Sequence, residues 1–122
     1  MAAHFEKCLT VTETDTEEGS LSLPIPWLGI LPPFELGIHE VKIYASDGFG
    51  FDWEFRCSTK RMGRGYWKPV LHPEDWLKFV DHKGLQVGDK IILDSEPNDS
   101  IGRHFRIRAQ KLNHEDGKWV DV

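Results

Sequence analysis

The sequence has few cysteines, no long apolar run and no surplus of positive charge. Cys8 and Cys57 lie far apart and lack a metal-binding spacing such as C-x-x-C, so we expect two reduced thiols on half-buried strands. The longest apolar stretch, Leu21 to Phe34, contains four prolines and is shorter than the roughly 20 apolar residues of a membrane helix. The opening residues MAAHFEK contain no apolar signal region, so we expect a soluble intracellular protein with no membrane partner.

The scarcity of positive charge bears on the kind of partner. The chain has 15 Lys and Arg residues against 20 Asp and Glu residues, which gives a formal net charge of −5. Proteins that bind nucleic-acid phosphates are usually basic, so the overall balance argues mildly against that class. The 122-residue length and the 39% hydrophobic content are those of one folded domain, which we expect to span residues 1–122.

Alternation of apolar and polar residues predicts several short strands. The clearest are two runs, 39–46 and 51–58, joined by Asp47-Gly48, a dipeptide typical of tight hairpin turns. The polar and acidic residues 12–19 are predicted to form a loop. Further strands are predicted at residues 4–11, 20–23, 67–71, 90–93 and 103–110, with a last one near Trp119 and Val120.

The sequence predicts a helix at residues 73–83 and contains signals for both its start and its end. Pro73 suits the first helical position, and the two acidic residues after it favour the positive end of the helix. Trp76, Phe79 and Val80 fall on one apolar face, and Gly84 can supply the left-handed residue that ends the helix. We predict that this apolar face covers one mouth of a barrel.

These elements add up to about seven short strands, connected mainly by hairpins and loops, with one or two short helices. The fold class predicted is therefore mainly β and mainly antiparallel. A chain of this size avoids exposed strand edges by curling its sheet into a closed or half-open barrel. A weaker helical turn is expected at residues 27–31.

Charge is distributed unevenly between two segments. Residues 12–19 contain four acids and no base, whereas residues 56–68, RCSTKRMGRGYWK, contain five bases and no acid. Two glycines give the basic segment backbone freedom, and Tyr66 and Trp67 place aromatic rings beside the charge. Such a segment suits a nucleic-acid backbone, because Lys and Arg bind phosphate and aromatic rings pack on sugars or bases. A solvated hairpin tip explains the same residues, and the pattern alone leaves both interpretations open.

Motifs for other functions are missing. The six histidines are scattered without the H-x-x-x-H spacing of a zinc site, and no nucleophile elbow or phosphate-binding loop occurs. We therefore expect no metal, no cofactor, no catalytic residue and no enzyme activity. The outward row of His104, Arg106 and Arg108 is either a solvated strand face or a second basic surface for the acids of a partner or a neighbouring copy.

Three motifs in order resemble the plant B3 DNA-binding domain, which is found in auxin response factors and related plant transcription factors. They cover residues from about 4 to 110, nearly the whole chain. The motifs are F-E-K-x-L-T at Phe5, Glu6, Lys7, Leu9 and Thr10, W-x-F-R at Trp53 to Arg56, and W-x-x-F-V followed by G-L-x-x-G-D at Trp76, Phe79, Val80, Gly84, Leu85, Gly88 and Asp89.

The resemblance implies a seven-stranded open pseudobarrel with two short helices that binds double-stranded DNA in the major groove. Two loop-bearing arms would grip the duplex: a first arm at about residues 10–23 and a second arm at about residues 56–69. It also implies transcription regulation in the plant nucleus, with other transcription factors or a second copy as further partners. The DNA-binding residues implied by position are Lys7, Thr12, Lys60, Arg61, Arg64, Tyr66 and Lys68.

The first arm departs from the family pattern. Many B3 domains have Ser-Asp after the L-T of the opening motif and basic or small residues beyond it. Here the arm reads TETDTEEGSLSLPIP, with four acids and no Lys or Arg. Carboxylates repel phosphates, so three outcomes stay open: sparse base reading, weak affinity, or a β-barrel that has become a protein–protein interaction module. The discriminating feature is whether the acidic residues 13–18 lie beside the basic segment or away from it.

Overall fold

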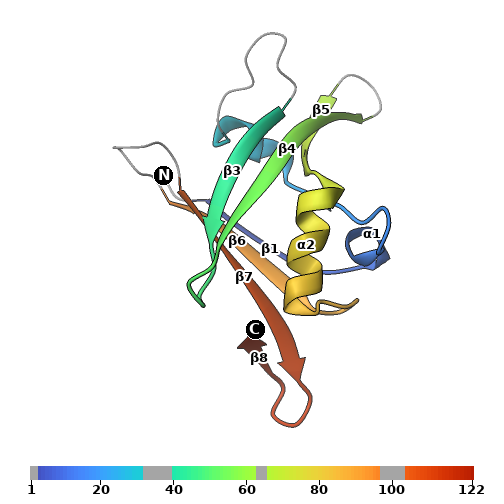
Figure 1. The fold of residues 1–122 in the computed structure, drawn as a ribbon, viewed down its shortest axis with the longest axis vertical. Helices are drawn as coiled ribbons and strands as arrows, with labels where there is room; N and C mark the ends of the chain where they lie inside the picture. Colours follow the sequence, from blue (N-terminus) through green and yellow to red (C-terminus); the bar gives the residue numbers. More distant parts are fainter. Residues whose placement is uncertain (1–2, 32–39, 63–65, 97–103) are drawn as a thin grey trace.

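The computed structural model describes residues 3–31, 40–62, 66–96 and 104–122 (Figure 1). The predicted mainly β fold is confirmed. In chain order the elements are β1 (Ala3–Cys8), α1 (Val11–Thr14), β2 (Leu21–Ser22), the 3-10 helix η1 (Ile25–Gly29), β3 (Glu40–Ser46), β4 (Asp52–Met62), β5 (Tyr66–Leu71), α2 (Pro73–Lys83), β6 (Lys90–Glu96), β7 (His104–Asn113) and β8 (Lys118–Asp121).

Seven of the described strands form one curled sheet in the order β1-β6-β7-β3-β4-β5-β2, and β8 pairs with β7 outside this path. Only β3 and β7 pair in parallel, through two residues of each strand; the other pairings are antiparallel. β1 and β2 are the two ends of the path. Because they do not pair with each other, the barrel stays open along one side.

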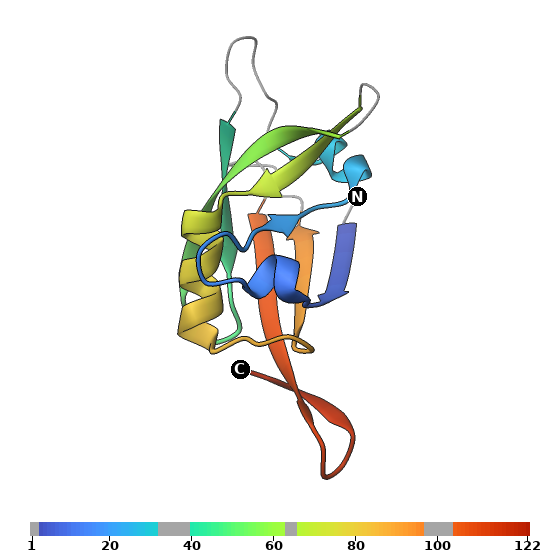
Figure 2. The same cartoon turned by 90° about the vertical axis from the view of Figure 1, so that its right-hand side faces the viewer.

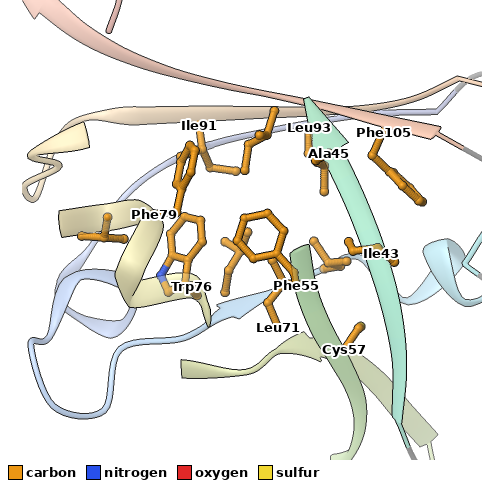
Figure 3. Close-up of a cluster of buried hydrophobic side chains, with 14 of the residues drawn as sticks. Ile43, Ala45, Phe55, Cys57, Leu71, Trp76, Phe79, Ile91, Leu93 and Phe105 are labelled. Carbon is orange, nitrogen blue, oxygen red and sulfur yellow. The ribbon is translucent and has the colours of Figure 1, made fainter. Parts of the chain in front are cut away.

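The core fills the inside of the curled sheet, and helix α2 covers it (Figure 3). Inward residues of β3, β4, β6 and β7 are buried, as their alternation predicts. From the helix, Trp76 and Phe79 are fully buried and stack with ring centroids 5.8 Å apart, while Phe79 also meets Phe55 edge-on at 6.0 Å. Buried aromatic rings each remove roughly 150–250 Å² from water, so this contact supplies a large part of the hydrophobic stabilisation.

Both ends of α2 lie where the sequence predicts them. Pro73 is at the start, and Gly84 adopts the left-handed conformation with φ of 64°. The N–H of Leu85 donates to the carbonyl of Val80 at 2.9 Å, which satisfies a carbonyl that the helix leaves without an internal partner. Lys111 adds a hydrogen bond to the carbonyl of Gly84 at 2.7 Å. The predicted helical turn near residue 27 is confirmed as η1, which begins two residues earlier than expected.

Two turn predictions were wrong. Residues 12–19 do not form only a loop, because α1 begins at Val11 and is capped by the side chain of Thr10. The hairpin between β3 and β4 is confirmed, but its connection is five residues long, from 47 to 51, rather than a tight Asp-Gly turn. In it the Asp47 carboxylate accepts the N–H groups of Phe49 and Phe51 at 2.8 and 3.1 Å, which stabilises the wider turn.

The two thiols differ from each other in exposure. Cys57 is fully buried, and burial raises its pKa to about 12, whereas Cys8 is exposed rather than half-buried. Both are free, as the spacing predicts. Among the described residues, no helix has the length and apolar character that a membrane crossing requires.

A buried ion pair fixes the β3–β4 hairpin to the end of α2. Lys83 lies 3.0 Å from Asp47, and their side chains are only 5% and 1% exposed. Burial alone raises the pKa of Asp47, but hydrogen bonds from Trp53, from Lys83 and from the two backbone N–H groups outweigh it and lower the pKa to about 2. The folded protein therefore stabilises the ionised form of the Asp47 carboxylate.

The Gly84→Ala variant should lower the free energy of unfolding by about 1 kcal/mol, because a Cβ is disfavoured at this positive φ. Urea titration measures the change. Gly48→Ala is the matched control, since Gly48 has no positive φ and a Cβ there meets no atom within 4 Å. Equal destabilisation by both variants would contradict the role of the left-handed Gly84 at the end of α2.

Asp47→Asn should lower the free energy of unfolding by about 3 kcal/mol at pH 7, because it leaves the buried Lys83 unpaired. The folded pKa lies below the ordinary value of 3.8, so in the unmodified protein this stabilisation is complete only above about pH 5. Roughly 2 kcal/mol of it is lost as the pH falls towards 2, a loss that the variant lacks. Denaturant titration at several pH values measures both effects, with the exposed Asp81→Asn as control; the same pH dependence in Asp47→Asn would refute the ion pair.

Candidate nucleic-acid interface

An open groove of about 390 Å³ lies along the side where the barrel is not closed. Figure 2 shows the elements that border it, β1, β2 and η1, together on one side of the molecule. Phe5 packs edge-on against Trp27 of η1 with ring centroids 6.3 Å apart, which holds the two edges of the sheet close to each other. The residues that line the groove are Phe5, Lys7, Ser22, Leu23, Pro24, Ile25 and Lys68. Two DNA-binding residues implied by position, Lys7 and Lys68, are thus brought together from distant parts of the sequence.

The β4–β5 hairpin adds a second lysine beside Lys68. Lys60 is its direct cross-strand neighbour, so both side chains lie on the same face of the hairpin. Like charges in this position repel each other. Neither lysine has an ion-pair partner among the described residues, so an anion bound between them would relieve the repulsion.

The other predicted residues of the second arm are placed only in part. Arg61 and Tyr66 belong to β4 and β5 and pair with Trp67 and Met62, but their side chains lie outside the described part. Arg64 also lies outside the described residues. Their predicted contacts with phosphates and base edges stay predictions. Trp67, which follows Tyr66 and pairs with Arg61, is 48% exposed, and strand alternation places its ring on the opposite face of the hairpin from the two lysines.

Glu13, the first acidic residue of the first arm, is buried and holds the arm in place. The Glu13 side chain is only 2% exposed, and its carboxylate accepts hydrogen bonds from the Thr10 N–H at 2.7 Å and the Thr10 hydroxyl at 2.9 Å. The other carboxylate oxygen lies 3.1 Å from the Lys7 ammonium. The backbone carbonyl of Glu13 accepts the indole N–H of Trp76 at 2.8 Å. Glu13 therefore links the arm, the groove and the core, and its charge does not face outward.

The second acid is also used locally. The Asp15 carboxylate accepts the N–H groups of Glu17 and Glu18, each at 2.9 Å. These bonds, that from Glu18 first, hold the pKa of Asp15 below its ordinary value. Glu17 and Glu18 themselves remain exposed, as does Thr12 on α1. Three of the four carboxylates of the acidic arm are thus exposed to solvent, and two of these, Glu17 and Glu18, have no hydrogen-bond or ion-pair partner among the described residues.

The acidic turn lies away from the described part of the second arm. Thr14 and Thr16 line a cavity of about 360 Å³ together with Val80, Asp81 and Leu85 from the C-terminal end of α2 and beyond. The β4–β5 hairpin leads into the opposite, N-terminal end of the same helix. In Figures 1 and 2 the described ends of β4 and β5 that point away from α2 lie at the top of the molecule, whereas α1 lies lower, beside α2.

One base of the second arm has a structural role that the charge pattern did not reveal. Arg56 donates to Asp75 at 2.9 Å and to Glu74 at 2.7 Å, and so joins β4 to the start of α2. Burial raises the pKa of Asp75, but the hydrogen bonds from Arg56 outweigh this effect and lower it. Sequence reasoning assigned the two acids to the positive end of the helix but could not identify the arginine that binds them.

A Ser-His-Glu cluster lies on the outer face of the sheet. The Ser58 hydroxyl and the Glu40 carboxylate contact the same ring nitrogen of His72, Nε2, at 2.5 and 3.3 Å. Activation of a serine needs the acid on the opposite ring nitrogen, so this arrangement is not a catalytic triad. His72 is the residue that leads into α2, and its ring joins the helix start to β3 and β4. In the described ranges, no three metal-binding side chains gather at one point.

Comparison with known proteins gives similar structures but no similar sequences. No protein-family model matches the chain, and no curated protein matches it significantly in sequence. The structure of the Arabidopsis FUS3–DNA complex, which contains a B3 domain, is similar over 89% of this chain and 97% of that chain, with a TM-score of 0.69 and 25% identity. The hypothetical Arabidopsis thaliana protein At1g16640.1 is similar over 89% of this chain and 90% of its own, with a TM-score of 0.56 and 19% identity.

Both structures have a B3-type fold, and the matches extend over nearly the whole chain. The second supports the fold alone, because its identity is low. The B3 resemblance predicted from three sequence motifs is confirmed, and the chain has the B3 fold.

Proposed function

We propose that this protein binds double-stranded DNA in a sequence-selective way, with its two arms in the major groove, and so regulates transcription in the nucleus. The observation that carries the proposal is the open groove between the edge strands, which presents Lys7 and Lys68 between the two arms. A chain with the same fold has been solved as a DNA complex.

Local charge supports this function despite the net charge of −5. Phosphate binding depends on cations that face the duplex rather than on the sum over the molecule. Lys60 and Lys68 lie side by side, and no described carboxylate neutralises them. Glu13 is buried and paired with Lys7, so it adds no unpaired charge to the groove, whereas Asp15 is exposed and keeps its charge on the turn that follows α1.

Lys7 is a positioned phosphate ligand in this proposal. Its ammonium has three donors, and Glu13 takes one of them at 3.1 Å. The side chain is 35% exposed, so the remaining donors can reach a phosphate oxygen at the groove. The exposed hydroxyl of Thr12 can donate to the backbone of the same duplex.

Base reading falls to the second arm. Arg61 and Arg64 have the bidentate donors that pair with guanine in the major groove, and Tyr66 can pack on a sugar or base beside them. The alternative, a protein-interaction module built on the acidic arm, expects that arm to lie beside the basic one and cancel its charge. The position of α1 at the far end of α2 favours DNA instead. Selection from a pool of random duplexes tests whether one sequence is preferred.

Changing Lys60, Arg61 and Arg64 together to Ala should abolish retention on duplex DNA at physiological salt, because it removes three cations of the second arm. In low salt, where binding is measurable, the slope of log K against log salt should become shallower by about 3. Fluorescence anisotropy with a labelled duplex measures both quantities.

The control removes three exposed lysines elsewhere, through Lys42→Ala, Lys78→Ala and Lys118→Ala in one chain. It changes the net charge equally and should largely retain binding. Equal losses in the two triple variants, or a salt slope near zero in the unmodified protein, would show that the second arm does not bind DNA.

Changing Glu17 and Glu18 together to Gln should raise DNA affinity by roughly threefold at low salt, since it removes two exposed charges that repel phosphate near the duplex. The gain should shrink as salt is added. Glu54→Gln with Glu115→Gln, which removes two exposed acids from other surfaces, should change affinity less. Identical affinity of both variants would place the first arm away from the DNA.

A further inference from the structure

The cavity of about 360 Å³ between the turn after α1 and the C-terminal end of α2 lies apart from the groove. Figure 2 shows this turn passing beside the helix. Three apolar residues form part of the cavity wall: Leu77 and Val80 from α2, and Leu85 just beyond it. Val80 and Leu85 belong to the core and Leu77 packs against it, so the floor of the cavity is apolar.

The polar groups that line the same cavity are not used by the fold. In the part of the chain that the structure describes, the Thr16 hydroxyl, the Asp81 carboxylate and the Gln86 side-chain amide have no hydrogen-bond or ion-pair partner. Asp81 lies in the last turn of α2, where the helix dipole also favours a positive charge. The cavity therefore combines an apolar floor with oxygen acceptors for a cation.

The turn beside the cavity is negatively charged. Asp15, Glu17 and Glu18 are exposed on it, and the carboxylates of Glu17 and Glu18 have no partner among the described side chains. Thr16, which lines the cavity, lies between them in the sequence. A cation in the cavity would therefore be attracted by the turn as well as by Asp81.

The lysines close to the end of α2 do not cancel this charge. Lys83 pairs with Asp47 at 3.0 Å, and Lys111 pairs with Asp89 at 2.6 Å. Lys78 is exposed on α2, but it adds one positive charge against the four exposed acids of the turn and the helix end. The surroundings of the cavity therefore remain negative.

We propose that this cavity binds an arginine side chain from a basic segment of a partner protein. The aliphatic stem would lie on the apolar floor, while the guanidinium reaches Asp81, Thr16 and Gln86. A guanidinium has five donors in a planar fork, so it can serve three acceptors together better than the compact ammonium of lysine. Arginine binding and DNA binding are independent, because the cavity and the groove share no residue.

Other occupants fit this cavity less well. The exposed acids would repel the phosphates of a nucleic acid, and in the described ranges no three metal-binding side chains gather at one point. A second copy of the chain would have to offer the basic β4–β5 hairpin, with Lys60 and Lys68. Such a contact joins unlike surfaces of identical chains, so it would be head-to-tail and would not close into a dimer.

The test uses the full chain and a short peptide with arginine at every third position, glycine and serine between, and an uncharged fluorophore. Fluorescence anisotropy should show binding that weakens as salt is added. Asp81→Asn should weaken it about fivefold, the loss expected for one partly exposed ion pair. Glu115→Gln, which removes an exposed acid from the β7–β8 turn, is the matched control and should weaken it much less.

A peptide with citrulline in place of arginine makes the result specific, because citrulline keeps the shape of the side chain and lacks its charge. It should bind at least about tenfold less tightly, and Asp81→Asn should not change its binding. Thermal unfolding of Asp81→Asn, with an unchanged midpoint, excludes misfolding as the cause of a loss. DNA binding by the same variant is measured separately, so failure of either proposal remains distinguishable from failure of the other.

Equal binding of the arginine peptide to Asp81→Asn and to the unmodified protein would overturn the proposal, as would equal binding of the citrulline peptide. A lysine peptide that binds as tightly as the arginine peptide would overturn the assignment to arginine. Self-association in sedimentation, lost both in Asp81→Asn and in Lys60→Ala with Lys68→Ala, would assign the cavity to a second copy and would also overturn it.

Discussion

The indole of Trp76 connects the core to the candidate interface. It is fully buried against Phe79, and a buried indole N–H needs an acceptor, which here is the backbone carbonyl of Glu13. That bond fixes the first turn of the acidic arm, and the carboxylate of the same residue holds Thr10 and Lys7. The position of a cation at the groove thus depends on hydrophobic packing beneath the helix.

Several acidic residues in this chain stabilise the fold through hydrogen bonds and ion pairs. Glu13, Asp15, Asp47 and Asp75 each accept several hydrogen bonds within the fold, so their charge stabilises turns, a helix start and a buried lysine. The surface charge therefore differs from place to place: in the described part of the chain Lys60 and Lys68 have no ion-pair partner, and the turn after α1 exposes acidic side chains. Net charge alone therefore underestimates what this protein can bind.

Sequence predicted the elements whose limits are encoded locally. Helix α2 has its proline, its apolar face and its terminal glycine within twelve residues, and all three lie where expected. Helix α1 also has a local signal, Thr10 and Glu13 in the spacing of a capping box, which the acidic composition of the segment obscured. The wide turn at Asp47 was missed because it depends on Lys83 and Trp53, which periodicity does not connect to it. The charge of the second arm was predictable, but the pairing of Arg56 with Asp75 and the meeting of Lys7 with Lys68 arise only when distant strands come together.

The strand that carries Lys7 pairs with β6, so Phe5 stands opposite Leu93. A chain leaving the ribosome has therefore synthesised β2 to β5 and α2 before β1 can find its partner. Contacts of such long sequence separation form slowly and cost chain entropy that local hairpins do not. The groove is accordingly among the last surfaces to be completed during synthesis, and nascent chains that lack β6 cannot present Lys7 in its final setting.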